Sequence, residues 1–103
     1  MRRAARIDSN QVEVVRVLRA AGCKVKSLAA VGDGLPDLLV GYRRRLSLLE
    51  VKDGCKVNSK QRLTDDEQKF HDEWEGYPIF IVSNPIRALI VVGVDVEVAR
   101  CQM

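Results

Sequence analysis

Apolar residues in the first quarter of the chain recur at the three- and four-residue spacing of an amphipathic helix. They are Val14, Val15, Leu18 and Ala21. Ser9 or Asn10 suits the N-cap of such a helix, and Gly22 is a typical residue at which a helix stops. The pattern therefore predicts a helix from about residue 9 to residue 21.

Two shorter helices are predicted farther along the chain from their capping residues. Thr64 followed by Glu67 forms the capping-box pattern, and the helix that it opens would run to about Glu75. Asn84 and Pro85 open a last helix to about residue 90, because proline suits the first helical position. Residues 91–98 either extend this helix or add a strand, and both readings remain open.

Four segments rich in apolar residues are predicted to form strands. They are Lys24–Leu28, Leu35–Tyr42, Arg45–Lys52 and Tyr77–Val82, and the last one is expected to be buried. The resulting order is helix, three strands, helix, strand and helix. This order predicts an α/β fold in which helices flank a mixed β-sheet.

The second and third strands, joined by an arginine-rich turn, predict an antiparallel hairpin whose register depends on loop length. A four-residue loop places Gly41 opposite Leu46 and sets Asp37 opposite Glu50. A three-residue loop places Leu38 opposite Glu50 and turns Asp37 to the other face of the sheet. Only the first register, or a bulge that repairs the second, brings the two carboxylates together.

Length and composition fit one domain spanning residues 1–103, with residues 1–8 as a basic arm. The chain is 47% hydrophobic and 30% charged, as is usual for a globular protein. No apolar run approaches the roughly 20 residues that cross a membrane, so we expect no membrane partner. We expect a cytoplasmic location, which free thiols would suit. Three widely spaced cysteines, Cys23, Cys55 and Cys101, fit free thiols in a reducing compartment.

Charged residues within two apolar strands give the clearest indication of chemistry. Glu50 and Lys52 are two positions apart, so they point to the same face of their strand. Asp37 follows a Gly-Asp-Gly turn and lies near the start of the preceding strand. Charges are costly in such a setting unless the protein uses them. The alternative is that Asp37 caps a turn while Glu50 and Lys52 form a surface pair, but the apolar character of both strands argues against it.

Carboxylates that hold a divalent cation are suited to the hydrolysis of phosphodiester bonds. We expect Asp37 and Glu50 to bind Mg²⁺, with the carbonyl of Val51 as a further ligand. Lys52 would then either orient or deprotonate the attacking water, or stabilise the charge on the phosphate. A lowered pKa of Lys52 would favour the first of these roles.

These segments resemble the PD-(D/E)xK nucleases through Pro36-Asp37 and Glu50-Val51-Lys52. More narrowly, the chain is similar to the small stand-alone VRR-NUC nucleases often found in phages, which are related to archaeal Holliday-junction resolvases. The similarity covers roughly residues 6–92, from Asn10-Gln11 to Leu63-Thr64 with Phe70 and Trp74. It implies a restriction-endonuclease-like fold, Mg²⁺- or Mn²⁺-dependent cleavage of branched or structured DNA, and a homodimer in the cytoplasm of a phage-infected or bacterial cell.

The resemblance places metal binding on Asp37 and Glu50 and catalysis on Lys52. Relatives use a glutamate of the first helix as a further metal ligand, and the corresponding position in this chain is Gln11. Gln11 lies on the inward stripe, whereas Glu13 lies about 200° around the helix and points away from it. A glutamine carbonyl binds a cation without contributing charge, so we expect weaker metal affinity. Gln11 is favoured at the site, and Glu13 is the less favoured alternative.

Basic residues near this predicted site suit a polyanionic partner. Those expected to contact DNA phosphates are Arg43, Arg44 and Arg45 at the hairpin tip, and Lys56, Lys60 and Arg62 after the third strand. Two other functions remain open. One is a catalytically weak or inactive nucleic-acid-binding module with the same fold, which Gln11 would suit. The other is a structural or regulatory α/β domain whose carboxylates are ordinary surface charges.

Overall fold

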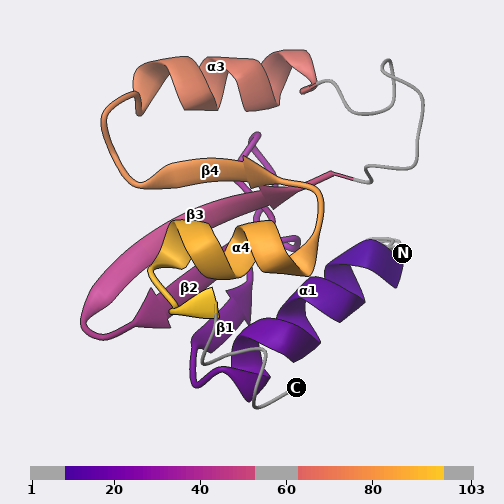
Figure 1. The fold of residues 1–103 in the computed structure, drawn as a ribbon. Coiled ribbons are helices and arrows are strands. Elements are labelled where there is room, and N and C mark those ends of the chain that lie inside the picture. Colours follow the sequence, from indigo (N-terminus) through magenta and orange to yellow (C-terminus); the bar gives the residue numbers. More distant parts are fainter. Residues whose placement is uncertain (1–8, 53–62, 97–103) are drawn as a thin grey trace.

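The computed structural model describes residues 9–52 and 63–96, which form a four-stranded mixed sheet flanked by helices (Figure 1). Its elements are α1 (Ser9–Ala20), β1 (Lys24–Ser27), β2 (Leu38–Tyr42), β3 (Arg45–Val51), α3 (Asp65–Glu73), β4 (Ile79–Val82) and α4 (Pro85–Val92). The predicted α/β class is confirmed, and the elements of the described residues follow the predicted order. The capping box of Thr64 and Glu67 and the N-cap of Asn84 are both present.

The strands lie in the order β1-β2-β3-β4, with β1, β2 and β3 antiparallel and β4 parallel to β3. In the β2–β3 hairpin Gly41 lies opposite Leu46, which is the first of the two predicted registers. Tyr42 and Arg45 also pair, so the turn itself consists of Arg43 and Arg44. Both arginines have positive φ values, 50° and 68°, as a tight hairpin turn of this kind requires.

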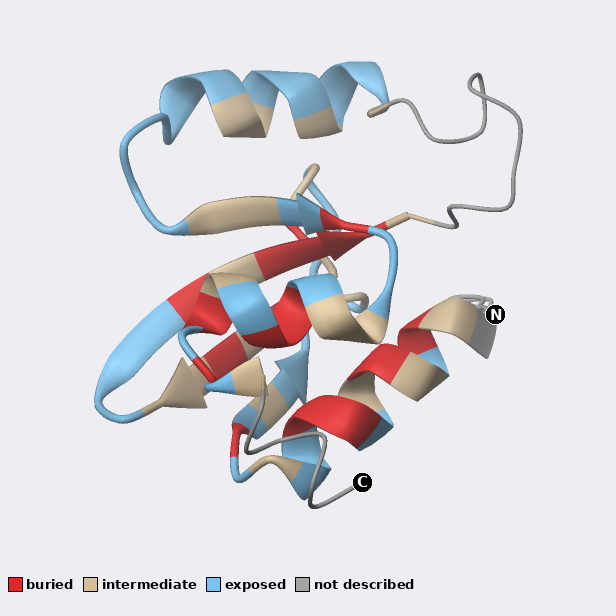
Figure 2. Cartoon of the chain, viewed as in Figure 1, coloured by how far each residue is buried: buried red, intermediate tan, exposed pale blue. Residues whose placement is uncertain are grey.

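One face of the sheet carries the hydrophobic core, and α1 and α4 lie side by side over it (Figure 1). Figure 2 shows the buried positions gathered between these two helices and the strands. The fully buried members include Val14 and Leu18 of α1, Leu38 and Val40 of β2, Leu49 of β3 and Leu89 of α4. Each buried leucine contributes about 1.5–3 kcal/mol to folding, so this core holds α1 and α4 firmly to the sheet.

The first turn of α1 is fixed to the ends of two strands by one side chain. The Nδ2 atom of Asn10 donates to the carbonyl of Lys52 at 2.8 Å and to the carbonyl of Ser83 at 3.1 Å. Lys52 directly follows β3 and Ser83 directly follows β4. The start of α1 therefore lies beside the C-terminal ends of β3 and β4.

Two predicted strands differ from the structure. The predicted strand Leu35–Tyr42 begins only at Leu38, because Pro36 has no N–H to donate and the carboxylate of Asp37 takes the N–H of Val51. The prediction that Tyr77–Val82 is buried is wrong. β4 is an edge strand in which only Val82 is buried and Ile81 is 50% exposed. Hydrophobicity indicated a strand there, but not its position in the sheet.

The remaining expectations concern the chain ends, the cysteines and membranes. α4 continues to Val92 and ends at Gly93, which has a φ of 97°, while residues 94 and 95 form no strand. The thiol of Cys23 is free and buried. The basic arm, Cys55, Cys101 and residues 97–98 lie outside the described residues. Within the described part of the chain, no helix has the length and apolar character needed to cross a bilayer.

Candidate active site

Asp37 and Glu50 lie next to each other where the β2–β3 hairpin ends. Leu38 pairs with Leu49, so the same register, continued by one residue, sets Asp37 opposite Glu50. The Oδ2 atom of Asp37 also accepts a hydrogen bond of 2.7 Å from the N–H of Val51. Side chains alternate along a strand, so both carboxylates lie on the face of the sheet opposite α1 and α4.

The two carboxylates are close enough to interact by a hydrogen bond, and both hold protons more tightly than usual. Glu50 is only 2% exposed. Burial, followed by the charges of Asp37 and Glu67, raises the pKa of Glu50 to about 9. Burial also raises the pKa of Asp37. The pair therefore favours a protonated state, or the company of a cation, over two bare negative charges.

Lys52 lies between two carboxylates. Its Nζ atom is 3.0 Å from Oε1 of Glu67 and 3.6 Å from Oε2 of Glu50. Burial works against the charge, but the hydrogen bond to Glu67 and the neighbouring carboxylates raise the pKa of Lys52 above its usual value. Among these side chains Lys52 is an ammonium ion, which favours the second of its two expected roles, the stabilisation of phosphate charge.

Glu67 belongs to this cluster, although a structural role in capping its helix had been the favoured prediction for it. Its Oε1 atom accepts from Nζ of Lys52 and also from the N–H of Thr64, at 2.8 Å. Partial burial opposes ionisation, yet these two donors leave the pKa of Glu67 below its usual value. The signal that could have found it is the capping box itself, because a capping carboxylate points back toward the chain that precedes the helix.

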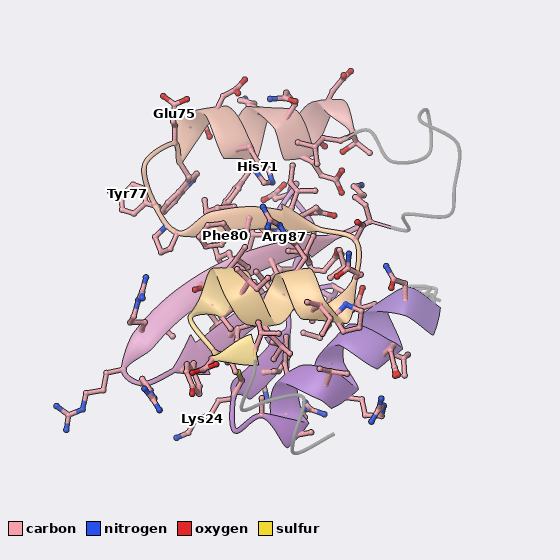
Figure 3. All side chains as sticks on the ribbon, in the orientation of Figure 1. Lys24, His71, Glu75, Tyr77, Phe80 and Arg87 are labelled. Carbon is pink, nitrogen blue, oxygen red and sulfur yellow. The ribbon has the colours of Figure 1, made fainter. Side chains whose placement is uncertain are left out.

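α3 carries Glu67 over the face of the sheet that α1 and α4 leave open. His71 points from α3 toward β4, while Glu75, just after the helix, points away (Figure 3). Phe70 and Trp74 stack on each other, with ring centroids 5.4 Å apart. None of the residues of α3 is buried, so the helix covers this face only loosely.

Gln11 and Glu13 lie on different sides of α1, as helix phase predicted. Gln11 is buried and lines a cavity of about 500 Å³ together with Leu38 and residues of β1. Glu13 forms a salt bridge of 2.7 Å with Arg16, and its side chain is 41% exposed. Gln11 is thus packed between α1 and the sheet next to Asn10, whereas Glu13 points outward.

The oxygen atoms of this site suit a divalent cation, although few of them carry charge. The Oε1 atom of Glu50 is buried and has no hydrogen-bond partner among the described residues. Asp37 and Glu50 supply hard oxygen atoms, and a cation would offset the burial and the nearby negative charges that raise both pKa values. No set of three or more His, Cys, Asp or Glu side chains in residues 9–52 and 63–96 is arranged to hold a metal. Neutral oxygens, such as the carbonyl of Val51, would have to complete the coordination.

The arginines expected to contact DNA lie at the far end of β3. Arg43, Arg44 and Arg45 are all exposed, and the guanidinium of Arg43 lies 5.3 Å from the ring centroid of Tyr42. Glu50 is five positions along β3 from Arg45, which corresponds to roughly 16 Å. Lys56, Lys60 and Arg62 lie outside the described residues.

Comparison of the chain with protein-family models, with curated proteins and with solved structures gave no match.

Proposed function

We propose that this protein is a metal-dependent endonuclease that hydrolyses phosphodiester bonds in branched or structured DNA. The observation that carries the proposal is the buried pair of Asp37 and Glu50, with the pKa of Glu50 raised to about 9. Such a pair is unstable as two bare charges and is relieved by a divalent cation. Perturbed carboxylates of this kind are typical of functional sites.

Each residue of the cluster has a role in this proposal. Asp37 and Glu50 hold Mg²⁺ or Mn²⁺, and the carbonyl of Val51 supplies a neutral oxygen ligand. Gln11 lies on the α1 side of the sheet, so its side chain would have to reach around the strand ends to join them. When bound, the ion acts as a Lewis acid toward the phosphate and makes a bound water a better nucleophile. Lys52, as an ammonium ion, lies beside this position and stabilises negative charge that develops on the phosphate.

The arginine turn gives this site a second contact with DNA. The distance of roughly 16 Å between Arg45 and Glu50 corresponds to about five base-pair steps of a duplex. Arg43, Arg44 and Arg45 would bind backbone phosphates at that distance from the cleaved bond. Lys56, Lys60 and Arg62 complete the proposed DNA-binding set. Contacts of this kind position the protein and carry no base sequence information.

A homodimer is part of the same proposal, because a branched junction offers two strands to cleave. β4 is an edge strand whose outer side has no partner strand among the described residues. Exposed apolar side chains lie on it and near it, at Ile81, Tyr77 and Trp74. An unprotected edge of this type favours pairing with another chain.

The second candidate is a nucleic-acid-binding module with weak or no cleavage activity. It is favoured by the small number of charged ligands, since the described residues offer no group of three acidic, histidine or cysteine ligands for a metal. Gln11 stands where a further carboxylate would strengthen the site. The two candidates share the same binding surface and differ only in turnover.

The test is cleavage of a labelled four-way DNA junction in Mg²⁺, in Mn²⁺ and in EDTA. We expect cleavage in either metal, none in EDTA, and loss of cleavage in Asp37→Asn and Glu50→Gln. Glu13→Gln is the matched control, because Glu13 is an outward-facing carboxylate on the same molecule, and it should cleave normally. Junction binding without cleavage by the unmodified protein would refute the nuclease and support the binding module.

A further inference from the structure

α3 is loosely packed, and its first turn lies against the rest of the molecule at Gly34. None of its residues is buried. Gly34, which has a φ of 76°, lies so close to the carbonyl of Asp66 that a Cβ atom at this position would collide with it. The first turn of α3 is therefore the part of the helix that is fitted to the body of the protein.

The same turn reaches Lys52 of the candidate site through one oxygen atom of Glu67. Oε1 of Glu67 accepts a hydrogen bond from the N–H of Thr64 at 2.8 Å and from Nζ of Lys52 at 3.0 Å. The hydroxyl of Thr64 in turn accepts from the N–H of Glu67 at 3.2 Å. The cap that starts the helix is thus also the anchor of the lysine.

We propose that Glu67 is a positioning residue that holds the ammonium group of Lys52 at the site, so that docking of the first turn of α3 determines where this charge lies. The proposal rests on the nuclease function given above. Glu67 contacts no reacting atom; it acts on the site by holding Lys52 and through its charge beside Glu50.

The geometry explains why a second carboxylate is needed. The Nζ atom of Lys52 lies closer to Glu67, at 3.0 Å, than to Glu50, at 3.6 Å. A cation held by Glu50 would repel the ammonium group, and a lysine side chain has many conformations in which to move away. Glu67, on another element, gives Lys52 a negative partner that does not depend on Glu50.

The side chains of Lys52 and Glu67 are 15% and 18% exposed, which places this ion pair between surface and core. A pair in that setting is held more firmly than one in open solvent, where exposed pairs contribute little. The hydrogen bonds are also charge-assisted, and these are stronger than those between neutral groups.

Three variants separate positioning from helix capping. Glu67→Gln removes the charge that holds Lys52, while its amide oxygen can still accept from Thr64, since glutamine also serves in a capping box. Thr64→Ala removes the cap hydroxyl and weakens the start of the helix, but it keeps the carboxylate of Glu67. Glu73→Gln changes an exposed carboxylate on the same helix.

The first measurement needs no DNA and no metal. Limited labelling with an amine-reactive reagent, followed by peptide mass spectrometry, gives the rate at which Lys52 is modified in each purified protein. Loss of the ion pair should make labelling of Lys52 roughly three- to tenfold faster in Glu67→Gln. Thr64→Ala and Glu73→Gln should label within about twofold of the unmodified protein, and circular dichroism shows that each variant is folded.

The second measurement is the Mg²⁺-dependent cleavage of a four-way junction. We expect Glu67→Gln to lower kcat about tenfold with KM for DNA unchanged, because a misplaced charge affects the transition state more than binding. Thr64→Ala should keep kcat at a temperature where it remains folded. If Glu67 served only to cap the helix, Thr64→Ala would lower kcat more than Glu67→Gln does.

The outcomes distinguish this proposal from the nuclease proposal. Equal labelling of Lys52 in the unmodified protein and in Glu67→Gln overturns the positioning role, whatever the cleavage assay gives. Faster labelling together with unchanged kcat overturns it too, because the position of Lys52 would then not matter for turnover. Absence of cleavage by the unmodified protein in either metal overturns the nuclease proposal instead.

Discussion

Replacing Glu50 by glutamine should make the metal-free protein more stable at neutral pH, although the same change should abolish cleavage. Glu50 is the most completely buried charged residue among the described residues, and its surroundings oppose its ionisation. Glutamine has nearly the same shape, carries no charge, and can donate to Asp37 as a protonated Glu50 would. The perturbation therefore removes an electrostatic cost with little effect on packing.

The magnitude follows from the raised pKa. Glu50 has a usual pKa of 4.5 and a pKa of about 9 in the folded protein. The folded state binds the proton more tightly, so its contribution to stability is complete below pH 4.5 and is lost progressively as the pH rises toward 9. At pH 7 the loss is about 3 kcal/mol, because each pKa unit corresponds to about 1.36 kcal/mol. The glutamine variant has no such loss.

The assay is urea unfolding in EDTA at a series of pH values between 4.5 and 8, followed by far-UV circular dichroism. Trp74 fluorescence is less suitable, because Trp74 lies just after α3 and reports on that helix first. The stability difference between Glu50→Gln and the unmodified protein should grow from near zero at pH 4.5 to about 3 kcal/mol at pH 7. Mg²⁺ should then stabilise the unmodified protein and not the variant.

The matched control is Glu13→Gln. The hydrogen bond from Arg16 leaves the pKa of Glu13 below its usual value, so its stabilising contribution is present at neutral pH and is lost as the pH falls. The control should therefore show the opposite and much weaker pH dependence. A Glu50→Gln variant that is equally or less stable than the unmodified protein at every pH would refute the reasoning, since it would mean that Glu50 is ionised without cost.

Three further variants, one of them a double substitution, test other parts of the structure. Gln11→Glu supplies a third carboxylate and should lower the Mg²⁺ concentration needed for half-maximal cleavage about tenfold, as measured by titration; no change would remove Gln11 from the proposed metal site. Arg43→Asn with Arg44→Gly suits the positive φ values of the turn and should stabilise the protein by about 1–2 kcal/mol in urea unfolding. The same double variant should also reduce the slope of log binding constant against log salt concentration by the equivalent of about two phosphate contacts. An unchanged slope would contradict contacts between these arginines and phosphates. Gly34→Ala should speed hydrogen exchange in α3, whereas Gly32→Ala, which has the same φ of 76° but open space around it, should not; equal effects would mean that backbone strain alone is responsible.

Local features of the fold could be predicted from the sequence because they depend on neighbours in the chain. The phase of α1 follows from the spacing of its valines and leucines, and it separates Gln11 from Glu13. The hairpin register follows from a short turn between two apolar strands, and it sets Asp37 opposite Glu50. Both results use contacts within one element or one hairpin.

The predictions failed, or were silent, where the answer depends on how distant segments dock. The contact between Lys52 and Glu67 joins residues 15 positions apart on different elements. Its formation requires α3 to be placed over the open face of the sheet, which hydrophobic spacing does not specify. The edge position of β4 was missed for the same reason. An apolar strand has the same sequence pattern whether or not another layer of the structure covers it. Nothing in the sequence indicated the hydrogen bonds from Asn10 to the residues that follow β3 and β4, because Asn10 was recognised only as a possible N-cap.

The parallel pairing of β3 and β4 has a consequence for the order of folding. The strands β1, β2 and β3 are neighbours in sequence and pair antiparallel, so they can assemble through short loops. β4 pairs with β3 only when the long connection from Lys52 to Pro78 brings the chain back to the same end of the sheet. We expect the hairpin to bring Asp37 and Glu50 together before α3 arrives with the partner of Lys52. The protonated form of the pair is then the one in which the sheet closes most readily, so refolding should be faster in mildly acidic solution than at alkaline pH.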